Sequence, residues 1–356
     1  MLKKAAALFL VCASSAICLS CGTTSSHFLY ATIPGANEIV VFREDPNSGI
    51  LTALAGSPIT AGQAVQAIVV HPSNKFLLSA NTGENDVSLF TVTAGGGLTE
   101  VTPRTAVGSA PTVIAMDAAG KFLYVGNSGS FDLSVFSINA GSSPPTLTPV
   151  AGSPFPIGLS PLNMKVAPSG NFLYITGTGN PGFIEAFSLS QGIPAVVSGS
   201  PFVTGGGPYG LVIAPSGGFL YTANKLDNSI SEFTINSDGS LTQFSNSPIG
   251  EQYSGPLALL IDNSGKYMYV ANQGSTNVAA FSIGSNGALT LLTTSPFVTG
   301  AQPATLASDP SGKYLFVGNQ SSPAVQSFSL DTSSGSLTSV ATYSVPGSPT
   351  SIAVTP

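Results

Sequence analysis

The segment PSGKYLFVGN, at residues 310–319, is one of seven copies of a single pattern that recurs along the chain. Each copy has an apolar, aromatic-rich run bounded by a polar turn, which is typical of a buried β-strand. The runs are HFLYATI at 27, KFLLSAN at 75, KFLYVGN at 121, NFLYITG at 171, GFLYTAN at 218, KYMYVAN at 266 and KYLFVGN at 313. Their spacing of 46 to 50 residues is the period of a repeat architecture.

Three further strand-like segments accompany each run. The second ends at a phenylalanine, the third usually begins Gly-x-Leu-Thr, as at 239–242, and the fourth precedes the next run, as in GLVIAPSG before residue 218. Four short strands repeated with a period in the forties are the signature of a propeller blade. The sequence therefore predicts an all-β, seven-bladed β-propeller over residues 28–356, with four antiparallel strands per blade, named A to D from the axis outward.

The two ends of the chain predict how the ring closes. The first run, from His27, has no leading strand, whereas the last segment, SIAVTP at 351–356, matches strand A and has no run after it. We expect this C-terminal strand to join the N-terminal blade, which removes two open sheet edges. Aromatic residues at equivalent positions of the runs are expected to fill the cores between blades: Phe28, Phe76, Phe122, Phe172, Phe219, Tyr267 and Tyr314.

The connections assign the two faces of the ring. Tight turns such as PSGK (310–313) and SDGS (237–240) join A to B and C to D on one face. The longer B–C loops and D–A crossovers lie on the other face. Propellers usually bind ligands where such loops surround the axial channel, so we expect a site there.

The N-terminus has the features of an export signal. In residues 1–20, Lys3 and Lys4 precede an apolar run too short to span a bilayer. CLSCG at 18–22 resembles a bacterial lipobox with Cys21 as the acylated residue, although Cys18 replaces the usual aliphatic residue; ordinary cleavage nearby is the alternative. We expect lipidated Cys21 and a tether over 21–27 to hold the exported protein at the cell envelope, periplasmic or at the outer membrane or cell surface, with no other membrane contact.

Sparse charge limits the possible partners. Only 7% of residues are charged, and loss of Lys3 and Lys4 with the signal leaves 8 basic against 16 acidic residues, a formal charge of −8. The chain has no Lys/Arg cluster, and binding to a phosphate backbone requires one. The composition thus excludes nucleic acid, and we expect a monomer.

With its repeats aligned, the chain resembles the seven-bladed lactonase-type propellers, which have YVTN-like repeats and include bacterial 6-phosphogluconolactonase and fungal carboxy-muconate cyclase. The resemblance spans about residues 28–356 and rests on PSGKYLFVGN (310–319), NSGKYMYVAN (263–272) and AAGKFLYVGN (118–127). It implies a lactone hydrolase or a related cycloisomerase.

The residues associated with catalysis in that family are not matched. Catalytic members use His, Arg and Glu around the channel, but the entries to the predicted A strands contain none of these. Beyond the signal the only histidines and arginines are His27, His71, Arg43 and Arg104, and His71 falls at an A–B turn, on the face opposite the expected site. Hydrolysis needs a positioned base and a donor to the oxyanion. We therefore predict no catalytic residue.

Five polar residues are expected at the channel mouth as a ligand-binding set: Gln66, Asn163, Lys165, Tyr209 and Gln302. Lys165 is the only cation in a predicted inner strand. It could hold a carboxylate or sugar acid in the channel, or it could be solvated by channel water or paired to an acid.

Two other polar sets have simpler explanations. The asparagines that end most B strands are predicted to close their own turns by bonding nearby backbone, rather than to form a ligand ring: Asn81, Asn127, Asn224, Asn272 and Asn319. Glu84, Asp86 and Asp227 could offer oxygens to Ca²⁺, but no calcium-loop spacing supports this. We predict neither a metal nor a cofactor.

These observations predict a non-catalytic binding module at the cell envelope. Its partner would be an envelope protein, a glycan, or a small sugar-acid or lactone ligand. The alternative, implied by the resemblance, is a lactone hydrolase or cycloisomerase.

Overall fold

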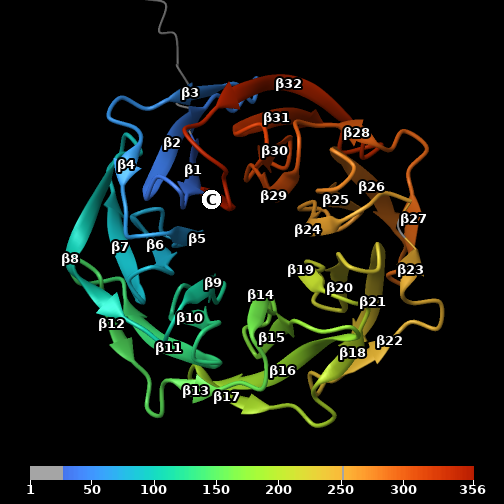
Figure 1. Ribbon diagram of the computed structural model, residues 1–356, viewed down its shortest axis with the longest axis horizontal. Helices are drawn as coiled ribbons and strands as arrows, with labels where there is room; N and C mark the ends of the chain where they lie inside the picture. The colour runs from blue at the N-terminus through green and yellow to red at the C-terminus, as the bar shows by residue number, and fades with distance from the viewer. Residues whose placement is uncertain (1–26, 251) are drawn as a thin grey trace, which may run out of the picture.

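Seven antiparallel sheets stand around a central axis in the computed structural model of the protein, which describes residues 27–250 and 252–356 (Figure 1). The predicted all-β, seven-bladed propeller is confirmed. Among the described residues there is no helix, and so none with the length and apolarity of a membrane span. The predicted signal peptide, Cys21 and all of the tether except His27 lie outside the described residues.

Three strands of each blade run across the thickness of the ring. Strands A line the axis: β5 (Val65–Val70), β9 (Pro111–Met116), β14 (Pro161–Val166), β19 (Pro208–Ile213), β24 (Pro256–Ile261), β29 (Pro303–Ser308) and β33 (Ser351–Val354). Strands B follow: β1 (His27–Ile33), β6 (Phe76–Asn81), β10 (Phe122–Asn127), β15 (Phe172–Gly177), β20 (Phe219–Asn224), β25 (Tyr267–Asn272) and β30 (Tyr314–Asn319). Strands C are β2 (Glu38–Glu44), β7 (Asp86–Val92), β11 (Asp132–Asn139), β16 (Gly182–Ser190), β21 (Ser229–Ile235), β26 (Asn277–Ile283) and β31 (Ala324–Leu330).

The outer strand D is continuous in two blades and split in five. The continuous ones are β8 (Leu98–Ala106) and β32 (Leu337–Ser344). The split ones are β3 (Leu51–Ala53) with β4 (Ile59–Thr60), β12 (Thr146–Pro149) with β13 (Phe155–Pro156), β17 (Ile193–Val196) with β18 (Phe202–Thr204), β22 (Leu241–Gln243) with β23 (Ile249–Gly250), and β27 (Leu289–Leu291) with β28 (Phe297–Val298).

A serine followed by proline explains the split. The hydroxyl of Ser57 accepts a hydrogen bond from the backbone N–H of Val41 in strand C at 2.8 Å, and Ser247 accepts one from Glu232 at the same distance. The proline after each serine has no N–H to give to the ladder. The serine oxygen therefore replaces a strand-D carbonyl where the backbone ladder is interrupted.

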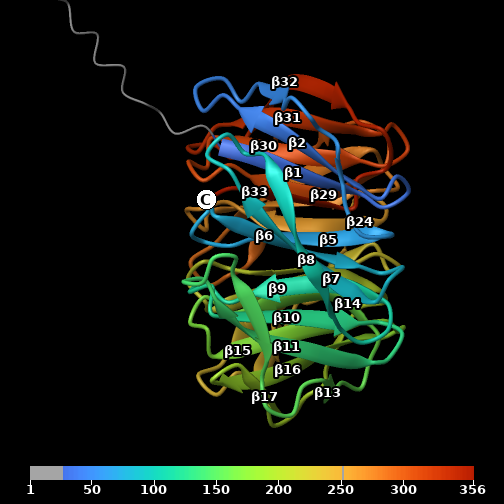
Figure 2. The same ribbon diagram turned by 90° about the vertical axis from the view of Figure 1, so that its left-hand side faces the viewer.

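The ring closes as predicted. β33 pairs antiparallel with β1, from Leu29 opposite Val354 to Thr32 opposite Ser351, so three strands of the first blade come from one end of the chain and one from the other. β1 begins at His27, which we had expected to end the tether. In the side view the strands cross the ring from face to face (Figure 2). The A–B and C–D turns thus share one face, which we call the A–B face, and the B–C loops and crossovers share the other, the B–C face.

The predicted aromatic residues form part of the cores between blades. Phe76 and Tyr314 are buried in two of these cores, and Phe172 and Tyr267 pack at the edges of two others. A glycine in the C–D turn of the next blade packs directly against the aromatic side chain. A Cβ on Gly239, at φ +85°, would be 2.3 Å from the aromatic ring of Phe172. Only glycine satisfies both the left-handed backbone and this close approach.

A tyrosine hydroxyl strengthens the same contact. The buried hydroxyl of Tyr221 donates to the carbonyl of Gly287 in the next blade at 2.6 Å, and Tyr174 makes the equivalent bond to Gly239 at 3.0 Å. Burial raises the pKa of both tyrosines, since the charged phenolate would lose its hydration. These hydroxyls therefore remain donors and hold neighbouring blades in register.

The core between the last and first blades contains a carboxyl. Glu44 stands two residues after Phe42, a position at which the other six blades have an aliphatic residue: Val92, Ile138, Leu189, Ile235, Ile283 and Leu330. It is fully buried, and neither carboxyl oxygen has a partner among the described residues. Burial raises its pKa to about 8, with smaller contributions from the charges of Asp309 and Asp45. The carboxyl is thus protonated at neutral pH.

Candidate functional site

A cavity of about 460 Å³ occupies the B–C end of the axial channel, and we call it the B–C cavity. All seven inner strands line it, together with Lys225 and Gln320 from two B–C loops. Its polar lining side chains are Gln66, Thr112, Asn163, Lys165, Tyr209, Lys225, Thr305, Gln320, Thr350 and Ser351. None of the described lining residues is a carboxylate or a histidine.

A β-bulge near the start of the inner strands directs side chains into this cavity. In β5 the residues that pair with β6 are Val65 and then Ala67, so Gln66 is the extra residue. In β19 Tyr209 occupies the same place between Pro208 and Gly210. The extra residue of a bulge is left unpaired and its side chain is re-aimed. Gln66 and Tyr209 therefore line the channel as predicted.

Lys165 is the cation of the inner wall. It is the fifth residue of β14, and its side chain is exposed to the solvent of a channel that is lined by all seven inner strands. This enclosure lowers the pKa of its ammonium group, because the charged form loses part of its hydration. No described acid in the cavity offsets that effect. Of the two structural alternatives for Lys165, pairing to an acid is not seen among residues 27–250 and 252–356.

A second cation stands at the rim of the cavity. Lys225 follows the last residue of β20 and is half-buried, with its ammonium nitrogen 5.1 Å from the centre of the Tyr209 ring. At this distance the ring face attracts the cation and limits its rotamers. Lys165 on β14 and Lys225 after β20 place both cations on the side of the channel formed by the neighbouring inner strands β14 and β19.

The remaining predicted residues have mixed positions. Asn163 lines the cavity, but its side-chain amide donates to the backbone carbonyl of Tyr209 at 3.1 Å and so joins two blades. Gln302 does not line the cavity. It is exposed, with φ +58°, and its carbonyl accepts a hydrogen bond from the backbone N–H of Gln320 at 2.9 Å. Gln320 lines the cavity instead, and its backbone is held by this bond to Gln302.

Sequence reasoning missed Lys225 and Gln320. Each directly follows the asparagine that ends strand B, at Asn224 and Asn319. Aligning that first loop position across the seven repeats would have exposed the signal, since Lys225 is the only charged residue there among the five blades with the asparagine.

The asparagines themselves are buried and do not reach the cavity. The amide of Asn81 donates to Asp86 at 2.7 Å and to Ser88 at 2.8 Å, both side chains in strand C, and Asn127 and Asn224 make equivalent bonds. Four of the asparagines, Asn272 included, therefore hold the B–C hairpin through side-chain partners rather than the backbone partners that we predicted. The side chain of Asn319 has no partner among the described residues.

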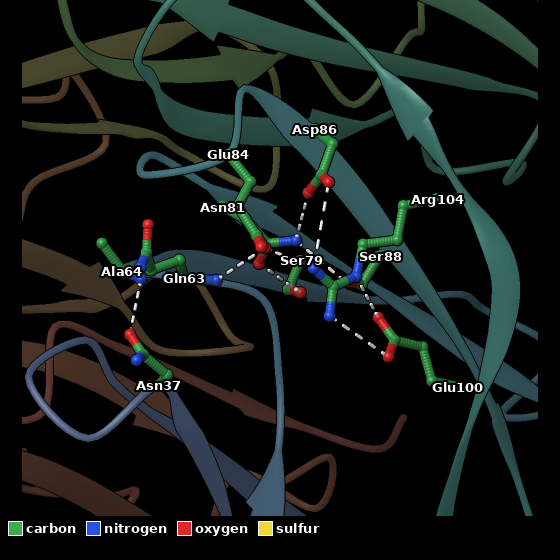
Figure 3. A network of polar contacts seen from close by, with 10 residues as sticks. All are labelled: Asn37, Gln63, Ala64, Ser79, Asn81, Glu84, Asp86, Ser88, Glu100 and Arg104. Atoms are coloured by element: carbon green, nitrogen blue, oxygen red, sulfur yellow. Dashed lines mark hydrogen bonds and ion pairs between the residues drawn. The ribbon is translucent and has the colours of Figure 1, made fainter.

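Two of the three acids considered for calcium contact an arginine. Arg104, on the continuous outer strand β8, contacts Glu84 and lies 2.6 Å from Glu100 and 3.9 Å from Asp86 (Figure 3). Glu84 also accepts the backbone N–H of Gln63 at 2.9 Å. Asp227 accepts the backbone N–H of Gly206. These contacts link the outer strand, the B–C loop and the crossover. The described residues contain no group of three or more His, Cys, Asp and Glu suited to a metal.

A seven-bladed ring with a polar, lysine-bearing cavity at the loop end of its channel is the architecture of a ligand-binding or catalytic propeller. The sequence matches the family described as Lactonase, 7-bladed beta-propeller, over residues 52–158 and 205–354. The match covers more than half of the chain, so the protein belongs to the seven-bladed β-propeller lactonase family. The resemblance stated from the repeats is confirmed.

Solved structures share the fold at low identity. A Bacteroides fragilis protein assigned as a 6-phosphogluconolactonase superposes with a TM-score of 0.79 at 21% identity, over 94% of this chain and 99% of that one. The periplasmic gluconolactonase of Pseudomonas aeruginosa gives 0.77 at 20%, over 93% and 99%. A Bacteroides uniformis protein assigned as a 6-phosphogluconolactonase gives 0.80 at 20%, over 93% and 99%. Comparison with curated proteins gives no match.

Proposed function

We propose that the protein is a lactone hydrolase whose substrate ring lies in the B–C cavity. Two features support this: membership of the lactonase family, and the convergence of two lysines on one polar cavity without a carboxylate among its described lining residues. The two lysines carry the proposal, because they offer a base and a cation in place of the His, Arg and Glu of the family's catalytic members. The hydroxyl and amide groups of Thr305, Gln320 and Thr350 suit a hydroxylated substrate such as a sugar-acid lactone.

Lys165 would act as the general base. A lysine with a lowered pKa is neutral in a larger fraction of molecules, so its amine can take a proton from the water that attacks the lactone carbonyl. The same proton then passes to the ring oxygen as the carbon–oxygen bond breaks, which gives the hydroxy acid. Lys225 would stabilise the oxyanion and then the product carboxylate.

Acid release from a panel of sugar-acid and simple ring lactones tests this proposal. We expect Lys165→Met to lower kcat/KM by about 100-fold or more, the usual contribution of a general base. In the parent, kcat/KM should rise with pH through the lowered pKa of Lys165 and level off below the 10.5 of a free lysine. Lys313→Met, on an A–B turn outside the cavity, is the matched control. Full turnover in Lys165→Met would contradict the proposal.

A non-catalytic binding module is the second candidate. It is favoured by the lack of any carboxylate or histidine among the described lining residues, which leaves the cavity without the usual acid–base pair. This candidate predicts that gluconate or another sugar acid binds in calorimetry, that Lys225→Met weakens this binding, and that no lactone is turned over. A glycan or an envelope protein would then be the natural ligand.

Export and lipid anchoring at Cys21 are part of the same proposal. His27 starts β1 at the A–B face, so a short tether would direct that face towards the membrane and the B–C cavity towards solvent (Figure 2). Mass spectrometry of the mature N-terminus in the native host tests the anchor. A Cys21→Ser variant should lose the lipid mass, whereas an unmodified Cys21 in the parent would favour ordinary cleavage.

A further inference from the structure

A second cavity, of about 400 Å³, opens at the opposite end of the channel, and we call it the A–B cavity. Its walls are residues near the ends of three inner strands, β5, β24 and β29, and of the closing strand β33. Six of the lining side chains are aliphatic and only partly buried: Val69, Val70, Leu260, Leu306, Ala353 and Val354. Apolar side chains left in contact with channel water favour an apolar occupant.

Two polar residues of the A–B cavity, Asp309 and Asn263, are engaged by hydrogen bonds. Asp309 accepts hydrogen bonds from the backbone N–H groups of Ser311 at 2.9 Å and Tyr314 at 2.7 Å, and is fully buried. The side-chain amide of Asn263 donates to the carbonyl of Pro310 at 2.9 Å. The Asp309 carboxylate is thus occupied by backbone donors, and the A–B cavity has no cationic side chain among its described lining residues, in contrast to the B–C cavity with its two lysines.

The two cavities meet within the channel. Both are lined by Ile68 and Leu306, the fourth residues of β5 and β29, and by Ile352, the second residue of β33. Lys165, the deepest residue of the B–C cavity, is the fifth residue of its strand, and so are Val69 and Leu260 in the A–B cavity. The ammonium group of the B–C cavity and the aliphatic wall of the A–B cavity thus share one level of the channel.

We propose that the A–B cavity receives an aliphatic chain of a ligand whose lactone ring or carboxylate lies beside Lys165 in the B–C cavity. The ligand class is therefore an amphiphile: a lactone or carboxylic acid with a linear apolar tail. The identity of the polar head group rests on the proposed function, whereas the aliphatic tail rests only on the A–B cavity and its continuity with Lys165.

Calorimetric titration with linear carboxylates from butanoate to decanoate tests the tail directly. Because each buried methylene is worth about 0.8 kcal/mol, the dissociation constant should fall roughly threefold to fourfold per added carbon until the chain reaches solvent at the A–B face. An affinity that does not depend on chain length would overturn the inference.

Two variants locate the effect. Ser308→Phe fills the A–B cavity from a partly exposed position, and should reduce decanoate affinity to that of butanoate without changing butanoate binding. Ser237→Phe, on an exposed C–D turn of the same face, is the matched control and should bind like the parent. If Ser308→Phe does not fold, Leu260→Asn makes the wall polar and should weaken decanoate alone. Equal decanoate binding in the parent and in the folded cavity variant would refute the site.

The same titrations separate this inference from the proposed function. Lactone turnover that is independent of chain length, with flat carboxylate binding, would refute the tail site and leave the hydrolase intact. Chain-length-dependent binding that is lost in Ser308→Phe, without turnover of any lactone, would refute the hydrolase and support the tail site.

Discussion

Replacement of Glu44 should stabilise the ring in a pH-dependent way. Glu44 lies in the core where the last blade meets the first, opposite His27 in β1 and near the charges of Asp45 and Asp309. Its carboxyl is fully buried without a hydrogen-bond partner among the described residues. In the unfolded chain the same carboxyl titrates with its ordinary pKa of 4.5, against about 8 in the folded protein.

The magnitude follows from the difference between these two pKa values. Below pH 4.5 the carboxyl is protonated in both states, so it has no effect on the pH dependence of stability. Between pH 4.5 and 8 the unfolded chain loses the proton while the folded protein keeps it, which lowers the free energy of unfolding as pH rises. At about 1.4 kcal/mol per pKa unit, the loss is about 3 kcal/mol at pH 7 and about 4 kcal/mol at pH 8, and it is nearly constant above that.

Urea unfolding of Glu44→Gln across this range measures the effect. Glutamine has the same shape but cannot ionise, so the difference in free energy of unfolding between the variant and the parent should grow in the variant's favour by about 3 kcal/mol from pH 5 to pH 8. Glu44→Leu, which restores the aliphatic residue of the other blades, should add a pH-independent gain. Glu38→Gln, at the other end of β2, is the matched control and should parallel the parent.

The reasoning fails if Glu44→Gln and the parent keep a constant difference in stability from pH 5 to pH 8. That result would mean that the carboxyl is hydrated or paired in the folded protein, and that its burial between the first and last blades does not hold it protonated. A growing difference in Glu38→Gln as well would point to a general charge effect instead.

Three further predictions concern the contacts between and within blades. Tyr221→Phe removes a buried hydrogen bond to Gly287 and should lower the free energy of unfolding by about 1 to 2 kcal/mol, whereas Tyr267→Phe, whose partner carbonyl on Ser333 is exposed, should cost less; equal losses would contradict the role of burial. Deletion of residues 351–356 removes β33 and exposes the edge of β1, so the thermal midpoint should fall and β1 should become susceptible to proteolysis; an unchanged midpoint would show that closure contributes nothing. Arg104→Gln leaves three acids together at a partly exposed site, and the stability loss should be below about 1 kcal/mol and smaller at high salt; insensitivity to salt would argue against an electrostatic contribution.

The sequence was informative wherever a feature repeats. Seven aromatic runs such as the one at Tyr314 identify seven B strands, because each blade must bury the same face against its neighbour. The first run lacks an inner strand, and the strand at 351–354 has no run after it. Both are completed when the last strand pairs with the first run, and this predicts the closure. Alignment of the repeats also contained the position of Glu44, although that departure from the aliphatic pattern was not recognised.

The candidate site depends on what does not repeat. The bulge in the inner strands re-aims Gln66 and Tyr209, and the path of each loop brings Lys225 and Gln320 to the channel while leaving Gln302 outside it. The bulge itself recurs in six inner strands, but the side chain that it carries differs from blade to blade, and the loop paths follow from hydrogen bonds that no periodic pattern encodes. Lys165 and the aliphatic residues of the A–B cavity, which share one level of the channel, likewise come from blades far apart in sequence. By itself the sequence thus determined the ring and its closure, and only the tertiary structure decided which side chains share its axis.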